Sequence, residues 1–233
     1  MITQKITKDV LAVVDARVVA EAANATVRKT VKVVTNNLKF NQKLNEMREY
    51  AKLNHVPIIN DEGLSFLKTI IALYKPKNIL EIGTAIGYSA IMMATVNKDI
   101  TITSIERDEK RYLEAIKNIK KAKLEDRIHL IYKDALEVEV SEFYDMIFID
   151  AAKAQNIKFF ERFTPHLVPN GTVITDNMSF HGLVDKKEEQ IKSRNVRQLV
   201  KKVKNYKDYL QKNNSFFTQF LEIGDGLAIS IKK

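Results

Sequence analysis

The stretch KNILEIGTAIGYS, residues 77–89, decides the fold. Its first part, KNILEIG (77–83), is a short apolar run without helical periodicity and predicts a buried strand, whereas YSAIMMATV (88–96) predicts a helix. Gly83 and Gly87 lie at the junction, where a backbone without side chains can approach a ligand closely. The G-x-x-x-G spacing differs from the G-x-G-x-x-G of pyrophosphate-binding turns and favours a ligand with an amino-acid carboxylate over a dinucleotide. A tight turn without a ligand would use the same residues.

Strand and helix signals alternate along the rest of the chain. Apolar, partly β-branched runs predict further strands at 100–106, 127–133, 144–150 and 171–177. Helices are predicted at 108–124, 157–167 and 188–212, and the last of these is long and basic. The chain ends in a predicted hairpin whose turn is Gly224-Asp225-Gly226. This order predicts an α/β fold: a doubly wound, mostly parallel sheet, helices on both faces and an antiparallel terminal hairpin.

The N-terminal residues differ from this pattern. Residues 1–35 carry valines at helical spacing without glycine or proline, which predicts one or two amphipathic helices, and another helix follows at 38–54. These helices could form an arm for dimerisation or RNA contact, although packing against the main domain is the expectation favoured here. We expect a helical extension over 1–37 and a main domain over 38–233.

Composition restricts both chemistry and compartment. The 233 residues include no cysteine, which excludes disulfides, thiolate nucleophiles and cysteine metal sites. The longest uncharged apolar stretch, 83–96, is too short to span a bilayer, and charged residues interrupt every apolar run near the N-terminus. We therefore expect a soluble, cytoplasmic protein without a signal peptide or membrane association.

The net charge of +9 is concentrated at the two ends of the chain. Residues 1–56 carry 10 basic and 5 acidic side chains, residues 57–184 carry 16 and 18, and residues 185–233 carry 12 and 6. Basic flanks around a slightly acidic centre suggest a polyanionic partner. Lysine-rich composition without any partner would give the same distribution, and charge alone does not separate the two.

Polar residues at strand ends supply the candidate site, because ligands of such sheets bind outside the carboxyl ends of the strands. Glu106 ends the second strand and could accept hydrogen bonds from a ribose diol, or could simply begin the next helix. Asp134 and Ala135 follow the third strand. Their side chain and backbone amide could bind an adenine edge, or could cap a short helix.

Two consecutive apolar strands, IFID and VITD, end in Asp150 and Asp176, and Asn177 follows directly. Two carboxylates and an amide oxygen suit Mg²⁺ or Ca²⁺ better than zinc or copper, although each aspartate alone could cap a loop. Lys153 could act as a base, neutralise a developing oxyanion, or form a salt bridge with one aspartate. Of the four histidines, only His181 is a candidate site residue, because it follows the metal residues closely.

Together these residues resemble the S-adenosylmethionine-dependent O-methyltransferases of the catechol type. The resemblance covers about residues 38–233 and rests on EIGTAIGYS, the acid in SIER, the DA of YKDALE, FIDAAK, VITDN and IGDGLAIS. It implies a Rossmann-like class I methyltransferase fold, with a seven-stranded sheet whose last two strands form a reversed hairpin. It also implies S-adenosylmethionine and Mg²⁺ as cofactors, and a homodimer.

The resemblance assigns roles to individual residues. Gly83 and Ser89 would lie against the methionine part of the cofactor, Glu106 would bind the ribose, and Ile59, in the linker 55–59, would cover the cofactor. The full set implied to bind the cofactor is Ile59, Gly83, Ser89, Glu106, Asp134, Ala135 and Asp150. The implied Mg²⁺ ligands are Asp150, Asp176 and Asn177, and Lys153 is the candidate base.

Within this family the sequence is most similar to bacterial enzymes that methylate 5-hydroxyuridine at the wobble position of tRNA. The similarity implies 5-methoxyuridine as the product and the anticodon stem-loop as the partner. The residues expected to contact RNA are Arg194, Arg197, Lys201 and Lys202, on the basic helix. The sequence departs from these enzymes at 1–35, at Asn156, where tyrosine is common, and at Ser179 and His181. The last three departures concern the shape of the acceptor pocket.

Three alternatives stay open. A methyltransferase for a small catechol or phenol would use the same site. A nicotinamide-dependent dehydrogenase would require a glycine fingerprint and a Tyr-x-x-x-Lys arrangement that we do not find in the sequence. A non-catalytic RNA-binding or dimerisation module would leave the intact set of Asp150, Lys153, Asp176 and Asn177 unexplained.

Overall fold

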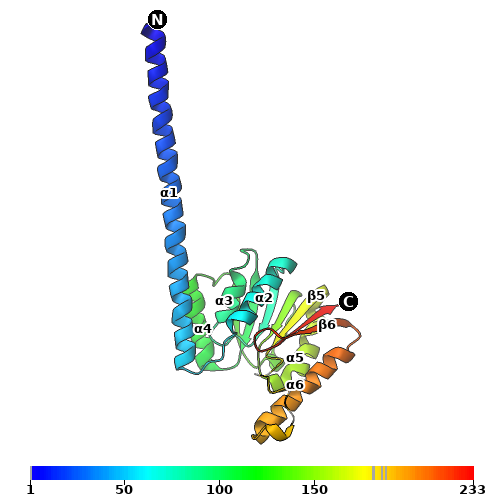
Figure 1. Ribbon diagram of the computed structural model, residues 1–233. Coiled ribbons are helices and arrows are strands. Elements are labelled where there is room, and N and C mark those ends of the chain that lie inside the picture. Colours follow the sequence, from blue (N-terminus) through cyan, green and yellow to red (C-terminus); the bar gives the residue numbers. More distant parts are fainter. Residues whose placement is uncertain (1, 180–181, 185, 187) are drawn as a thin grey trace. The chain divides into compact units, whose positions relative to one another are not determined.

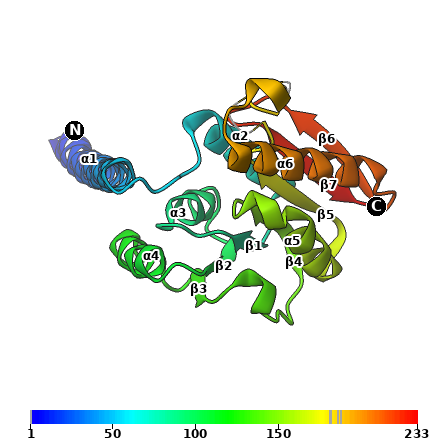
Figure 2. The same cartoon turned by 90° about the horizontal axis from the view of Figure 1, so that it is seen from below.

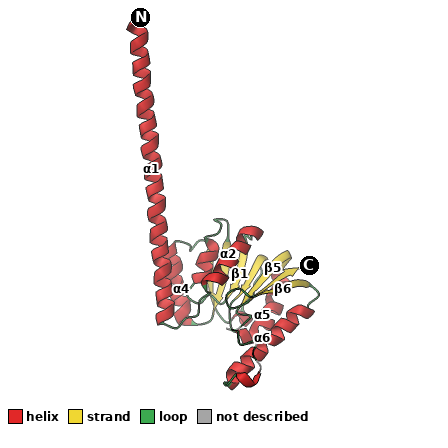
Figure 3. Cartoon of the chain, in the orientation of Figure 1, coloured by secondary structure: helices red, strands yellow, loops and turns green. Residues whose placement is uncertain are grey.

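The structure is a computed structural model that describes residues 2–179, 182–184, 186 and 188–233, with side chains from residue 24 onward except at residue 188. Its helices are α1 (Ile2–Leu53), α2 (Asp61–Tyr74), α3 (Tyr88–Ala94), α4 (Glu109–Ala122), α5 (Asn156–Phe163) and α6 (Arg194–Lys212). Its strands are β1 (Asn78–Ile82), β2 (Thr101–Glu106), β3 (Ile128–Tyr132), β4 (Tyr144–Ile149), β5 (Leu167–Asp176), β6 (Phe216–Leu221) and β7 (Leu227–Lys232). Figure 1 labels the helices together with β5 and β6, and Figure 3 shows the strands in yellow among red helices.

The chain divides into two compact units, Met1–Glu46 and Met47–Lys233. α1 is continuous from Ile2 to Leu53, so the helices expected at 1–35 and 38–54 form one helix. It contains no glycine or proline that would end it earlier. The expected boundary after residue 37 lies inside this helix, as does the division between the two units. Among the described helices, none has an apolar stretch that could cross a membrane.

The sheet contains seven strands in the order β3-β2-β1-β4-β5-β7-β6. The first five strands pair in parallel, and β7 pairs antiparallel with both β5 and β6. The strand order reverses between β1 and β4, and such a switch point opens a crevice at the carboxyl ends of the strands. The structure confirms the predicted α/β class, the mostly parallel sheet and the reversed terminal hairpin.

Helices cover both faces of the sheet. Figure 2 shows α3 and α4 on one side of the strands and α5 and α6 on the other. Leu80 and Ile82 of β1 belong to a buried core that also contains Phe160 of α5. Because side chains alternate along a strand, Glu81 points to the other face. There it accepts a hydrogen bond from Ser89 of α3. The switch point between β1 and β4 is thus held between two helical layers.

Three helices differ from the sequence analysis in further respects. α5 ends at Phe163 and not at 167, because Pro165 has no N–H to continue it and the 3₁₀ turn Thr164–His166 follows. The other two differ at their starts. α2 was not predicted, although Asn60 is a recognisable N-cap whose side chain accepts from the backbone N–H of Gly63. α6 begins at Arg194 and not at 188, because Ser193 caps it and accepts from the N–H of Val196. Both starts follow from ordinary capping chemistry that the sequence already contains.

Candidate active site

A pocket of about 490 Å³ lies at the carboxyl ends of the parallel strands. Its wall includes most of the residues that the sequence analysis singled out: Gly83, Glu106, Asp134, Ala135, Asp150, Lys153, Asp176 and Asn177. Five strands contribute them, so residues up to 94 positions apart in the sequence meet in one cavity. Two further candidates, Ile59 and Ser89, are not part of this wall.

The turn after β1 requires glycine at its first position. Gly83 has φ +100°, and a Cβ there would overlap the carbonyl oxygen of Asp150, which directly follows β4. The N–H groups of Gly83 and Thr84 both donate to the carbonyl of Ile105, at 3.0 and 3.2 Å. The backbone after β1 therefore packs directly against β2 and against the residue that follows β4, and bare backbone lines the pocket at Gly83.

Glu81 is a polar residue that the sequence analysis did not single out. It is fully buried under this turn and accepts hydrogen bonds from the hydroxyls of Ser89, at 2.5 Å, and Ser104. Burial raises the pKa of Glu81 to about 7, although the two serine hydroxyls oppose the shift. Glu81 holds Ser89 behind the pocket wall. The available signal was a charged residue inside an otherwise apolar strand.

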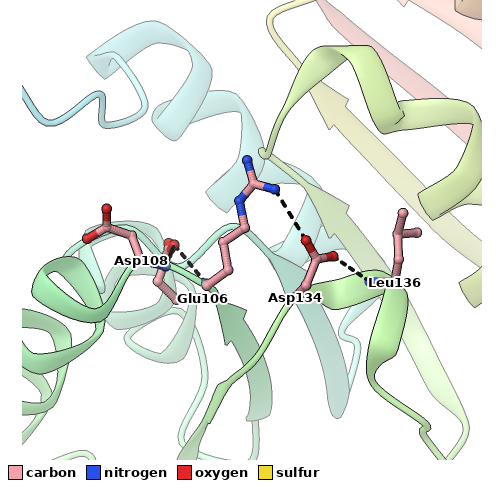
Figure 4. Close-up of polar contacts among 5 residues, drawn as sticks. Glu106, Asp108, Asp134 and Leu136 are labelled. Carbon is pink, nitrogen blue, oxygen red and sulfur yellow. Dashed lines mark hydrogen bonds and ion pairs between the residues drawn. The ribbon is translucent and has the colours of Figure 1, made fainter.

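Glu106 is fixed by three backbone donors, and Figure 4 shows its position at the end of β2. One carboxylate oxygen accepts from the N–H of Ala85 at 2.8 Å, and the other accepts from Arg107 at 2.9 Å and Asp108 at 2.8 Å. A carboxylate can accept about four hydrogen bonds, so capacity remains for a ligand. Glu106 thus orders the start of the next helix and lines the pocket at once.

Asp134 has the capping role considered for it and also lines the pocket. One carboxylate oxygen accepts from the N–H of Leu136 at 2.9 Å and caps the 3₁₀ turn Ala135–Glu137, as Figure 4 shows. The other oxygen pairs with the guanidinium of Arg107 at 3.2 Å, which links the ends of β2 and β3. Arg107 also lines the pocket, and the sequence analysis missed it. Its position directly after the strand-end acid was the available signal.

Asp150, Asp176 and Asn177 converge at the other end of the pocket. The Asn177 side-chain amide donates to Asp150 at 3.3 Å, and its backbone N–H donates to Asp176 at 2.7 Å. Burial, followed by the charge of Asp150, raises the pKa of Asp176 to about 7. Burial also raises the pKa of Asp150, while the charge of Lys153 lowers it. Lys153 therefore lies close enough to favour the ionised form of both carboxylates.

These three residues form a small oxygen-rich set. Within the described part of the chain, no three His, Cys, Asp or Glu side chains gather as a metal site. The candidate set instead combines two carboxylates with one amide oxygen. The repulsion between two buried carboxylates is the kind of cost that a divalent cation removes.

The terminal hairpin adds a residue that sequence reasoning used only as a turn signal. Asp225, between β6 and β7, lines the pocket, and its charge helps to raise the pKa values of Asp150 and Asp176. Its backbone carbonyl accepts from the N–H and the hydroxyl of Ser179, at 2.8 and 2.6 Å. Ser179 therefore joins the strand end to the hairpin. His181 lies outside the described residues.

The linker before α2 lines the pocket through different residues than expected. Pro57 and Ile58 are part of its wall, whereas Ile59 is buried at 5% exposure and lies beside Gly63. A one-residue change along an extended linker reverses the direction of the side chain.

Asn156, one of the departures expected to affect the acceptor pocket, is buried at the start of α5 and is not part of the pocket wall.

The basic helix α6 presents three of its four candidate residues to solvent. Arg194, Lys201 and Lys202 are exposed. Arg197 is partly buried, and its guanidinium donates to the backbone carbonyls of Ile191 and Lys192, at 2.7 and 3.2 Å. Arg197 thus holds the segment that leads into α6, and its substitution would disturb the structure as well as the surface charge.

Comparisons with known proteins identify relatives over most of the chain. The family model described as O-methyltransferase matches residues 26–233. A Staphylococcus aureus structure, proposed to be a caffeoyl-CoA O-methyltransferase, is 47% identical with a TM-score of 0.78, over 82% of this chain and 92% of that one. An O-methyltransferase from Bacillus cereus in complex with SAH is 26% identical with a TM-score of 0.70, over 82% and 91%. The caffeoyl-CoA O-methyltransferase of Populus kitakamiensis is 26% identical over 81% of this chain and 85% of that protein.

Proposed function

Because the chain belongs to the O-methyltransferase family, we propose that it transfers a methyl group from S-adenosylmethionine to the 5-hydroxyl of 5-hydroxyuridine at the wobble position of tRNA. The product would be 5-methoxyuridine, and the reaction would be assisted by Mg²⁺. S-adenosylmethionine would be the methyl donor for any acceptor. The specific part of the proposal is the identity of the acceptor. One observation carries the methyl-transfer part of the proposal: Glu106 and Asp134 share a single pocket with Asp150, Asp176 and Asn177. The choice of acceptor rests on surface charge.

S-adenosylmethionine supplies an electrophilic methyl group. The residues of the chain would bind and orient it: Glu106, which backbone N–H groups hold in place, would accept hydrogen bonds from the ribose hydroxyls, and the bare backbone at Gly83 would allow close approach. Asp134 and Ala135 lie at the end of β3, where the adenine would be bound. Fixing both reactants in one cavity converts a bimolecular reaction into an effectively unimolecular one.

The set of Asp150, Asp176 and Asn177 fits Mg²⁺, which prefers carboxylate and carbonyl oxygens. Bound Mg²⁺ would lower the pKa of a hydroxyl placed against it. In 5-hydroxyuracil the O5 hydroxyl lies beside the O4 carbonyl, so this base presents two adjacent oxygens as a catechol does. Lys153, beside the aspartates, would hold or remove the proton of the acceptor hydroxyl.

Surface charge supports an RNA acceptor. Arg194, Lys201 and Lys202 form an exposed basic group on α6, within a C-terminal region that carries 12 basic and 6 acidic residues. Unstacked anticodon bases are typical targets of sequence-specific RNA binding, and phosphates supply the electrostatic part of the affinity. We also propose that the enzyme acts in the cytoplasm as a homodimer.

A small catechol or phenol is the second candidate acceptor. The relatives support it, because the caffeoyl group named for the Populus enzyme is itself a catechol. An acceptor of this kind requires no affinity for RNA, and the basic side chains of α6 would then be ordinary surface residues.

The test is methyl transfer followed by mass spectrometry of nucleosides. The protein is incubated with S-adenosylmethionine, Mg²⁺ and tRNA from cells that lack wobble-uridine methylation, and a parallel reaction contains a simple catechol. Conversion of 5-hydroxyuridine to 5-methoxyuridine, lost in Asp150→Ala and retained in the exposed Asp99→Ala control, supports the tRNA acceptor. Methylated catechol together with unchanged tRNA would assign the enzyme to small phenols.

A further inference from the structure

One side of α1 carries an uncovered apolar stripe. Val27, Val31, Val34 and Leu38 recur at alternating steps of four and three residues, and their exposed fractions are 59%, 58%, 51% and 64%. Alternating steps of this kind repeat every seven residues and place the side chains in one narrow line along a helix. We call these four residues the α1 stripe.

The same seven-residue period continues in the sequence toward the N-terminus, where the backbone of α1 is still helical. Arg17 and Asn24 are the polar residues at positions of the period. The other positions before the stripe are apolar: Ile6, Val10, Val13 and Ala20. From residue 6 to residue 38 the pattern spans more than four heptads, a length that is typical of coiled coils.

The charges of α1 between residues 24 and 46 lie off the stripe. Its lysines between residues 24 and 46 occupy the opposite side of the heptad, at Lys29, Lys32, Lys39 and Lys43. The residues at the positions that flank the stripe are Arg28, Thr30, Thr35 and Asn37, and only Arg28 is charged. Two copies of residues 24–38 can therefore meet along the stripe without like charges facing each other in parallel register. Arg17 is the exception at a position of the period, since it would face Arg17 of the other copy at a cost in stability.

We propose that α1 pairs with α1 of a second copy of this chain as a parallel coiled coil. Asn24 occupies a position of the period at which a polar residue specifies register and a two-stranded assembly. In a parallel pair it faces Asn24 of the other copy, which satisfies both amides, whereas an apolar groove of another protein would leave it unpaired. A strict seven-residue repeat also drifts by about 20° per heptad around a straight helix, so the line stays continuous only when two helices supercoil.

This pairing is independent of the methyl acceptor. The family model begins at residue 26, and the two solved relatives cover 82% of this chain, so most of the period precedes the part that the family shares. The pairing would bring two catalytic units together whether their acceptor is tRNA or a small phenol.

Cysteine cross-linking of the full-length chain tests the pairing, because the protein has no cysteine of its own. Val27→Cys and Leu38→Cys place single thiols on the stripe, about 16 Å apart along the helix. Val33→Cys is the matched control, because Val33 is 52% exposed and lies off the stripe. Dilute protein is oxidised, and the disulfide-linked dimer is followed over time on non-reducing gels.

We expect both stripe variants to cross-link at least about tenfold faster than the control, since a disulfide requires Cα atoms within about 7 Å. Dimerisation through residues 47–233 alone would not distinguish positions 27 and 33. Equal rates for all three variants, or no cross-link in any, would overturn the pairing. Cross-linking at only one of the two stripe positions would overturn the parallel register.

Discussion

At the scale of single residues, the pocket concentrates carboxylates in places where burial raises their pKa. Glu81 and Asp176 both have pKa values raised to about 7, in each case chiefly by burial. The sequence analysis identified Asp176 because it ends a strand, but Glu81 is inside a strand and its role depends on Ser89 and Ser104. Such a network forms only when strand and helix pack together, so it could not be inferred from spacing.

Glu81→Gln should flatten the pH dependence of stability. The folded pKa of Glu81, about 7, lies above its ordinary value of 4.5, so the folded state binds more protons between these two pH values. The free energy of unfolding therefore falls as the pH rises from about 4.5 to 7, by an amount on the order of 3 kcal/mol. Glutamine removes this contribution, and urea denaturation at pH 5.5 and pH 8 measures the part of it, about 2 kcal/mol, that falls between these two pH values.

The control for this prediction is Glu109→Gln, because Glu109 is an exposed acid in the first turn of α4. Its profile should follow that of the unmodified protein. If Glu81→Gln lost as much stability between the two pH values as the unmodified protein, Glu81 would be ionised throughout and its assigned pKa would be wrong.

Gly83→Ala should destabilise the protein by about 3 kcal/mol or more, through backbone strain and collision with the Asp150 carbonyl. Gly182→Ala is the matched control: Gly182 also has positive φ, but no atom of the described residues lies within 4 Å of the added Cβ. Its cost should stay near 1 kcal/mol, the effect of φ alone. Denaturant midpoints compare the two, and similar losses would show that the close approach of β1 and β4 is not what requires glycine.

At the scale of elements, strands were predicted better than helix ends. The five parallel strands have strongly apolar runs, and each lies within two residues of its predicted start except β5, which begins at Leu167 and not at 171. The start of a helix depends on one capping side chain. The sequence analysis did not consider the two N-caps Asn60 and Ser193, so it missed α2 and placed the start of α6 too early. α1 is continuous because residues 2–53 contain no glycine or proline that would end the helix. The periodicity of apolar residues alone could not show that the two expected helices are one.

The exposed basic residues of α6 should set the salt dependence of tRNA binding. Replacing Arg194, Lys201 and Lys202 by alanine should weaken tRNA binding. It should also make the fall of the logarithm of the binding constant with the logarithm of the salt concentration shallower, by about one unit of slope for each phosphate that is no longer neutralised. Arg197 is excluded from this variant because its guanidinium holds backbone carbonyls. Binding is measured by fluorescence anisotropy with a labelled anticodon stem-loop at several salt concentrations.

The matched control removes the same kind of charge elsewhere. Lys98 precedes β2 and Lys120 lies in the last turn of α4, and both are exposed side chains outside the pocket wall. Lys98→Ala with Lys120→Ala should leave the slope almost unchanged. A decrease in slope as large as that of the α6 variant would mean that RNA binding follows net charge and that α6 is not the RNA surface.

At the scale of the whole molecule, the site could be located from the sequence because a parallel sheet brings its carboxyl ends to one edge. This rule alone placed Glu106, Asp134, Asp150 and Asp176 in one pocket, although they come from four different strand ends. It did not reveal Arg107 or the use of Asp225, because a side chain that bridges two strands, or a hairpin that closes over a site, depends on packing.

Calorimetric titration with S-adenosylmethionine tests directly whether this edge of the sheet is the cofactor site. Glu106→Gln should weaken binding at least about tenfold, because a charged acceptor for the ribose hydroxyls is removed. Glu109→Gln, which alters a nearby exposed acid outside the pocket wall, should bind as the unmodified protein does. Thermal unfolding of each variant confirms that it is folded. Equal affinities for the unmodified protein and a folded Glu106→Gln variant would contradict the assignment of this site.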